Sequence, residues 1–144
     1  VAMMDEVAET IIPETKTPGA KAAKTGAFMA LMVKDCYKAE HQQIFITGLK
    51  TINESAQQKF KSSFMDLDAE QRKTMLTALD AEQKEYTKDE ANKEKPHYFR
   101  MLKELTLLGF FTSEIGGTEV LKYVEVPGRY DACIPYKKGD IAYL

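Results

Sequence analysis

The sequence predicts an all-α protein, a bundle of about five helices followed by an irregular, partly extended C-terminal wrap. Two observations lead to this prediction. Between residues 3 and 108, apolar residues recur at intervals of three and four, the spacing of one helix face. Beyond Gly116-Gly117 this spacing is lost, and Pro127-Gly128 cuts a short alternating segment. The 144 residues fit a single domain, 1–144, with a core of its own.

Composition excludes several classes of protein. A hydrophobic content of 44% with 29% charged residues is typical of a globular chain. The net charge of −2 gives no basic patch for nucleic acid, so no nucleic-acid partner is expected. The longest apolar runs, 28–33 and 105–111, fall short of the roughly 20 residues of a transmembrane span, so none is predicted. The chain opens on Val1 without a signal peptide, and we expect that an upstream segment was removed.

The first two helices lie in the first quarter of the chain. Helical spacing predicts the first over residues 3–12, and Pro13 ends it. Two prolines and a glycine make residues 14–19 a loop. The second helix is predicted from Ala20 or Gly26 to Lys38. Its predicted apolar side consists of Phe28, Leu31, Met32, Asp35 and Cys36.

Two longer helices follow. The third is predicted over residues 40–60, with a single apolar stripe along it. That stripe consists of Phe45, Leu49, Ile52, Ala56 and Phe60. Asp68 and Gln71 form a capping-box pattern that opens the fourth helix, which is predicted to continue to about Glu85. Its core face is predicted to be Met75, Leu76 and Leu79.

A charged connection over residues 84–95 separates the fourth helix from the fifth. Pro96 suits the first turn of the fifth helix, and Gly109 suits its C-terminus. Its broad apolar face is predicted to be Tyr98, Phe99, Leu102, Leu105 and Leu108. Thr112 or Ser113 is predicted to cap one further turn, which the Gly116-Gly117 pair ends. From Tyr123 the chain is predicted to be extended.

The residues offer little for catalysis. The only histidines, His41 and His97, stand in no nucleophilic-triad context, and no glycine-rich phosphate loop is present. We therefore assign no catalytic, cofactor-binding or metal residue to this chain. Glu114 lies between apolar segments, so we expect it to be semi-buried and bonded to backbone amides. Cys36 is interpreted as a small apolar helix residue. For Cys133 three possibilities remain: a free thiol, an intrachain disulfide bridge or an intermolecular one.

The C-terminal third is rich in aromatic residues without periodicity. These residues are Phe110, Phe111, Tyr123, Tyr130, Tyr136 and Tyr143. Aromatic side chains contribute a large share of interface energy, so they are candidates for a partner-binding face. The other interpretation is that they cover the helical core.

Two motifs resemble one known family. Residues 11–20, IIPETKTPGA, resemble the opening of the gluconate 2-dehydrogenase subunit 3 proteins. Leu105-Thr106 and residues 109–116, GFFTSEIG, followed by Tyr123 and residues 126–128, VPG, resemble the close of that family. The resemblance spans nearly the whole chain, which would form one such domain over residues 1–144.

The resemblance implies the non-catalytic small subunit of a periplasmic or membrane-associated dehydrogenase complex of the gluconate or glucose type. The expected partner is a large flavoprotein of the glucose–methanol–choline oxidoreductase class, which holds FAD, and a cytochrome c subunit is a further expected partner. The small subunit is expected to aid maturation, export or assembly of the large one, commonly through a twin-arginine signal. Its expected place is the periplasm or cell envelope, and no cofactor is expected in this chain.

The turn 112–116 and the segment 123–133 are hypothesised to form the partner face, with Cys133 as an intersubunit bridge. The candidate residues are Phe110, Phe111, Thr112, Ser113, Glu114, Ile115, Gly116, Tyr123, Pro127, Gly128, Tyr130 and Cys133. The alternative function is a stand-alone helical ligand-binding or small hydrolytic protein. A deep pocket holding Glu114 or a histidine would favour that alternative, whereas an exposed apolar patch over the C-terminal third would favour the subunit.

Overall fold

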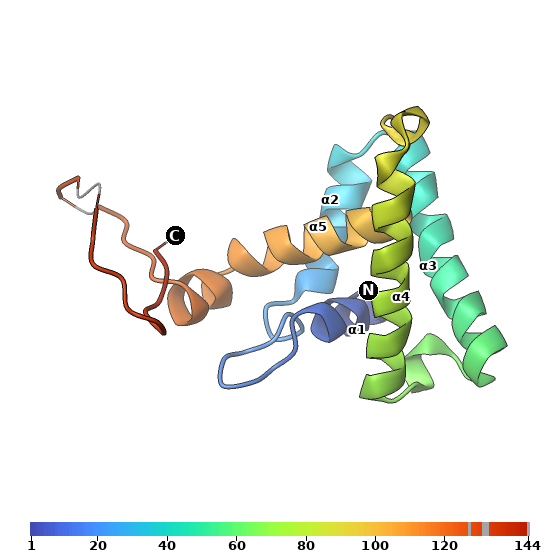
Figure 1. The fold of residues 1–144 in the computed structure, drawn as a ribbon, viewed down its shortest axis with the longest axis horizontal. Coiled ribbons are helices and arrows are strands. Elements are labelled where there is room, and N and C mark those ends of the chain that lie inside the picture. The colour runs from blue at the N-terminus through green and yellow to red at the C-terminus, as the bar shows by residue number, and fades with distance from the viewer. Residues whose placement is uncertain (127, 131–132, 144) are drawn as a thin grey trace.

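The computed structural model describes residues 1–126, 128–130 and 133–143, and it confirms the all-α bundle (Figure 1). The α-helices are α1 (Ala2–Ile11), α2 (Thr25–Cys36), α3 (Ala39–Phe60), α4 (Ala69–Lys88) and α5 (Tyr98–Phe111). Shorter turns lie at Phe64–Asp66, Glu90–Asn92 and Gly116–Val120. Within the described part of the chain, none of the helices combines the length and the apolar character that crossing a bilayer requires.

The fifth helix, α5, is the centre of the bundle. It packs against each of the other four α-helices, and Figure 1 shows it crossing between them. Its buried residues are Phe99, Met101, Leu102, Leu105, Thr106, Gly109 and Phe110. A helix that is apolar over so much of its surface is stable only when neighbours surround it. The central place of α5 therefore accounts for its broad buried surface.

Helices α3 and α4 confirm their predicted faces. In α3, Phe45, Ile52 and Ala56 are buried, and Leu49 and Phe60 pack against the same core. At the start of α4 the capping box is present. The Gln71 N–H donates to Asp68 Oδ1 at 2.8 Å, and the Asp68 N–H donates to Gln71 Oε1 at 3.2 Å. Both bonds satisfy backbone amides that a helix start leaves unpaired.

The predicted apolar side of α2 is wrong in part: Phe28 and Met32 pack against the core as half-buried side chains, but the other predicted members do not. Leu31 is 58% exposed and Cys36 is also exposed, whereas Met29 and Val33 are buried. The buried face begins with Thr25 and Gly26, where α1 comes close enough for the Gly26 N–H to donate to Asp5 Oδ1 at 2.8 Å. Because small residues set this face, the largest apolar side chains did not identify it.

The predicted end of α5 at Gly109 is also wrong. The helix continues to Phe111, and Gly109 lies within it, where a Cβ would meet the ring of Phe28 on α2. Glycine is needed here for a close approach of two helices and not for a turn. Pro96 precedes α5, whose N-cap is His97.

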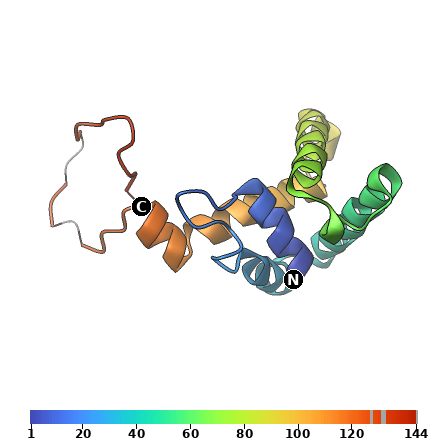
Figure 2. The ribbon, with the colours of Figure 1, turned by 90° about the horizontal axis from the view of Figure 1, so that it is seen from below.

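The Gly116-Gly117 pair does not end the following turn. Both glycines are buried, and Gly116 opens the π-helical turn Gly116–Val120. Ser113 does cap the segment, as predicted, because its Oγ accepts the Gly116 N–H at 3.0 Å. Beyond this turn the chain is irregular and extended. Figure 2 shows it lying past the end of α5, on the opposite side of the bundle from α3 and α4.

Candidate partner-docking surface

Residues 122–143 are here called the C-terminal loop, and the two ends of this segment meet. The Lys122 N–H donates to the Ala142 carbonyl at 2.8 Å, and Lys122 pairs with Tyr143 in an isolated parallel bridge. Lys122 Nζ also donates to the Tyr143 hydroxyl at 3.1 Å and lies 4.8 Å from the centre of that ring. Among the described residues this bridge is the only β-type pairing, so the predicted extended segment forms no strand ladder.

The apolar and aromatic side chains of the C-terminal loop are open to solvent. Tyr130 is 91% exposed, Val126 79% and Tyr136 75%. Tyr123, Ile134, Ile141 and Tyr143 are each more than half exposed. These side chains therefore do not cover the helical core. Exposed apolar residues gathered in one segment are typical of an interaction surface.

The C-terminal loop also encloses a cavity of about 580 Å³. Its lining includes Ile134, Tyr136, Ile141 and Tyr143, with Lys122 and Asp140 as the charged residues. Asp140 belongs to a local turn, in which its carboxylate accepts the Lys137 N–H at 2.7 Å. A partly apolar hollow of this kind can receive a side chain from a partner.

The structure divides the twelve candidate residues into two groups. Residues 110–116 lie between the end of α5 and the first residue of the π-helical turn, and the candidates from Tyr123 onward lie on the C-terminal loop. In the first group Phe110 is 1% exposed in the core, and Gly116 is buried. Phe111, Ser113 and Ile115 are half-buried. Only Thr112 and Glu114 are exposed, so the expectation that Glu114 is semi-buried is wrong.

The second group is open to solvent. Its described members are Tyr123, Gly128, Tyr130 and Cys133, all exposed. Pro127 lies outside the described residues. Tyr136 and Tyr143, named above as aromatic candidates, are exposed on the same segment, and so is Val126, but sequence reasoning missed the exposed Ile134 and Ile141. The sequence feature that could have identified the missed residues is the loss of helical spacing after Gly117. Large apolar residues beyond that point cannot line up on the face of a helix.

Both cysteines are free thiols. Cys36 lies in the last turn of α2, as interpreted, but it is exposed and does not join the apolar side on which it was placed, and Cys133 is exposed in the C-terminal loop. The intrachain bridge between them is not formed. An intermolecular bridge through Cys133 stays a prediction.

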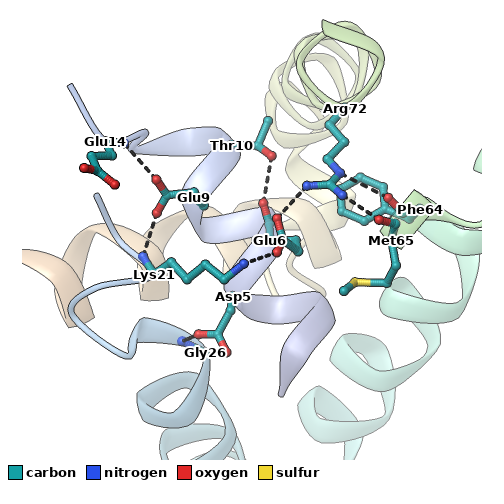
Figure 3. A network of polar contacts seen from close by, with 10 residues as sticks. All are labelled: Asp5, Glu6, Glu9, Thr10, Glu14, Lys21, Gly26, Phe64, Met65 and Arg72. Atoms are coloured by element: carbon teal, nitrogen blue, oxygen red, sulfur yellow. Dashed lines mark hydrogen bonds and ion pairs between the residues drawn. The ribbon is translucent and has the colours of Figure 1, made fainter. Parts of the chain in front are cut away.

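The first motif, residues 11–20, is closed by carboxylates of α1 (Figure 3). Glu9 accepts the N–H groups of Glu14 and Lys21, both at 2.8 Å, and so ties the two ends of the loop together. A Cβ on Gly19 would collide with the Glu9 carboxylate and with the main-chain nitrogen of Glu14, which explains a glycine at that position. This motif therefore has a structural role in joining α1 to α2.

Glu6 extends this network to α4. Its carboxylate pairs with Lys21 and with Arg72, and the hydrogen bond from Lys21 together with the Arg72 charge lowers its pKa. Arg72 also donates to the carbonyls of Phe64 at 3.2 Å and Met65 at 2.6 Å. Figure 3 shows the guanidinium beside the Phe64 ring. One charged cluster thus fixes α1, the loop and α4 together.

A polar cleft of about 710 Å³ lies where the start of α3, the end of α4 and the start of α5 meet. Both histidines line it, but Glu114 does not. His97 Nδ1 accepts the Phe99 N–H at 3.2 Å, so the neutral ring carries its proton on Nε2, 3.4 Å from Glu82 Oε1. Beside it, burial and then the Glu82 charge raise the pKa of Tyr98 to about 12.

Other charges of the bundle form pairs near its surface. Asp80 on α4 bonds Lys103 of α5 at 2.6 Å and Lys84 at 2.7 Å. These hydrogen bonds, that of Lys103 first, lower the pKa of Asp80 to about 2. In the part of the chain that the structure describes, no three His, Cys, Asp or Glu side chains gather into a potential metal site.

Comparison with known proteins gives one result. A family model described as gluconate 2-dehydrogenase subunit 3 matches residues 1–128. This range contains both motifs, the whole helical bundle and the first residues of the C-terminal loop. No curated protein and no solved structure matches the chain.

Proposed function

Because the chain belongs to the gluconate 2-dehydrogenase subunit 3 family, we propose that it is the non-catalytic small subunit of a dehydrogenase complex and docks onto the large subunit. The family is that of a subunit of a dehydrogenase complex, which makes an accessory role the expected one. The observation that supports docking is the C-terminal loop, whose tyrosines and described aliphatic side chains are exposed within one segment of the chain. Such side chains gain free energy when a partner covers them.

The proposed large subunit is a flavoprotein of the glucose–methanol–choline oxidoreductase class, which would hold FAD and oxidise a sugar or a sugar acid. This chain would aid its maturation, export or assembly in the periplasm or cell envelope. A cytochrome c subunit would accept the electrons. In this proposal the helical bundle supports the C-terminal loop, the loop makes the contact with the large subunit, and Cys133 would form an intersubunit bridge.

A co-purification experiment tests the docking. The tagged chain is co-expressed with the flavoprotein encoded beside it, and the amount of FAD that the tag retains is measured. A double variant, Tyr130→Ser with Tyr136→Ser, changes two side chains that are 91% and 75% exposed, so it should leave the fold intact. The matched control is Leu31→Ser, an exposed apolar residue on α2 of the bundle.

The wild type and Leu31→Ser should retain the flavoprotein, and the double tyrosine variant should lose most of it. If the large subunit is also insoluble without this chain, the maturation role is supported. A flavoprotein that folds, binds FAD and is never retained by the tag would overturn the proposal. Replacing Cys133 with Ser under oxidising conditions tests the bridge, which is refuted if the stability of the complex does not change.

The polar cleft favours a second candidate, a small-ligand site. Its volume of about 710 Å³ lies in the range of ligand pockets, and both histidines and Arg100 line it. Thermal unfolding with gluconate or glucose tests this idea. A rise in Tm that Arg100→Met abolishes would support a ligand site, and an unchanged Tm with either compound would exclude these ligands.

A further inference from the structure

The segment between α5 and the C-terminal loop is held by a chain of hydrogen bonds. Ser113 Oγ donates to the Phe110 carbonyl at 2.6 Å and accepts the Gly116 N–H at 3.0 Å. The Gly117 N–H donates to the Ser113 carbonyl at 2.9 Å. One hydroxyl thus joins the last turn of α5 to the first residue of the π-helical turn.

Gly116 leaves no room for a side chain. A Cβ at this position would overlap the carbonyl oxygen of Phe110 and crowd the backbone of Phe111. These obstacles are main-chain atoms of α5, so no rotamer change can relieve them. Even alanine would force the π-helical turn away from the end of α5.

The π-helical turn then holds the start of the C-terminal loop. The Leu121 N–H donates to the Gly116 carbonyl at 2.9 Å, and the Tyr123 N–H donates to the Gly117 carbonyl at 3.1 Å. Hydrogen bonds therefore run without a break from Phe110 to Tyr123. Short π-helical turns are uncommon, and they often occur at functional sites.

The exposed side chains of the same segment contribute little to this framework. Glu114 is exposed, and it accepts the Thr118 hydroxyl at 2.7 Å through its main-chain carbonyl and not through its carboxylate. The Thr112 hydroxyl bonds back to the Leu108 carbonyl of its own helix at 2.7 Å. The bonds that connect the two parts of the molecule thus come from Ser113 and the backbone.

We propose that residues 112–121 are a rigid mount that sets the direction of the C-terminal loop, and that the loop alone contacts the partner. This inference rests on the proposed function for the identity of that partner, the large flavoprotein subunit. Ser113 and Gly116 are then positioning residues, although both stand in the hypothesised contact face. A preordered loop binds more tightly because less conformational freedom is lost on docking.

The charges of the C-terminal loop indicate the chemistry of the partner surface. Residues 122–143 contain four basic and three acidic side chains, a net charge of +1 in a chain whose total is −2. Four tyrosines lie on the same 22 residues. The matching surface is therefore apolar, with hydrogen-bonding groups for tyrosine hydroxyls, and binding should depend only weakly on salt.

The mount can be tested without any partner. Cys36 on α2 and Cys133 on the C-terminal loop are both exposed, and they are the two cysteines of the chain. Nitroxide labels on these two cysteines report the distance between the bundle and the C-terminal loop by pulsed electron–electron double resonance. The wild type should give a narrow distance distribution.

Gly116→Ala and Ser113→Ala should broaden or shift that distribution, and Ser113→Thr, which keeps a hydroxyl, should restore it. Glu114→Gln is the matched control in the same segment and should change nothing. Circular dichroism verifies that the helical bundle stays folded in each variant. A wild-type distribution as broad as that of the Gly116→Ala and Ser113→Ala variants would overturn the mount.

Affinity for the FAD-loaded large subunit gives the second measurement. Ser113→Ala and Gly116→Ala should weaken binding by about tenfold, since the loop must be reordered on docking. Glu114→Gln should have no effect. If Glu114→Gln weakens binding as much as Ser113→Ala, the segment is a contact face and the inference fails. If the label distances behave as expected but no flavoprotein binds, the proposed function fails and the mount stands.

Discussion

The helical bundle and the C-terminal loop are built from similar residues and place them in opposite environments. In the bundle, Phe99 and Phe110 are 2% and 1% exposed, whereas Tyr130 and Tyr136 of the loop are 91% and 75% exposed. The difference lies in spacing and not in composition. Apolar residues at helical intervals line up on one face and can be buried together, while those of the loop have no common face. The bundle is thus stabilised from within, and the loop is available to a partner.

The largest test of this contrast compares Phe110→Ala with Tyr130→Ala. Phe110 is 1% exposed and belongs to the core, so its truncation should lower the free energy of unfolding by about 3–5 kcal/mol. Tyr130 is 91% exposed, and its truncation should change the free energy of unfolding by less than about 0.5 kcal/mol. Urea denaturation followed by circular dichroism measures both values.

For binding to the large subunit, the loop variant of this pair should have the larger effect. Tyr130→Ala should weaken binding to the large subunit, and Tyr136→Ala serves as a second loop variant. A stability loss for Tyr130→Ala close to that of Phe110→Ala would show that the loop belongs to the core. The separation of the molecule into two regions would then be wrong.

A middle-sized effect is expected in the charged cluster that joins α1, the first motif and α4. The Glu6 side chain is 14% exposed and pairs with both Lys21 and Arg72. Glu6→Gln leaves Arg72, itself 17% exposed, without its carboxylate, and should cost about 2 kcal/mol of stability. The control is Glu14→Gln, whose exposed side chain should contribute almost nothing. Equal Tm values for the two variants would contradict the structural role of the cluster.

The smallest effect concerns Asp80 and depends on pH. Its pKa of about 2 in the folded protein is below its value of 3.8 when unperturbed, because Lys103 and Lys84 bond the carboxylate. The ionised carboxylate therefore stabilises the fold above about pH 4, and this contribution is lost as the pH falls towards 2. At neutral pH, Asp80→Asn should cost less than about 1 kcal/mol.

Denaturation of wild type and Asp80→Asn over this pH range checks whether the stabilisation by Asp80 is lost in acid. The stability difference between them should shrink as the solution becomes acidic. A difference that stays constant down to pH 2 would mean that the carboxylate charge has no role. Binding through the C-terminal loop should not change in this variant, since Asp80 lies in the bundle.

Local patterns could be predicted where they depend on neighbours in the chain. The α3 stripe and the capping box of Asp68 and Gln71 are confirmed, because helical periodicity and capping act within a few residues. The face of α2 and the place of Gly109 could not be predicted. They depend on how closely another helix approaches, and a sequence does not state which small residue makes room for which neighbour.

The candidate site was predicted in part. The motif that ends at Gly116 and the tyrosines beyond it were identified as one partner face, yet the structure separates them into a hydrogen-bonded segment and an exposed loop. Ser113 and Gly116 could be recognised as hydrogen-bonding and turn-forming residues from their types alone. Their bonds to Phe110 and the missing space for a Cβ are visible only once α5 has a direction in space.

The sequence by itself determined the class of fold, the helices and the family, since periodicity, caps and two motifs are properties of residues close together in the chain. Only the tertiary structure decided that α5 lies at the centre, that Phe110 is part of the core, and that Tyr130 stands open to solvent. Burial depends on contacts between segments far apart in the chain. Two aromatic residues of similar chemistry are therefore distinguished only when the helices around one of them, and the empty space around the other, are known.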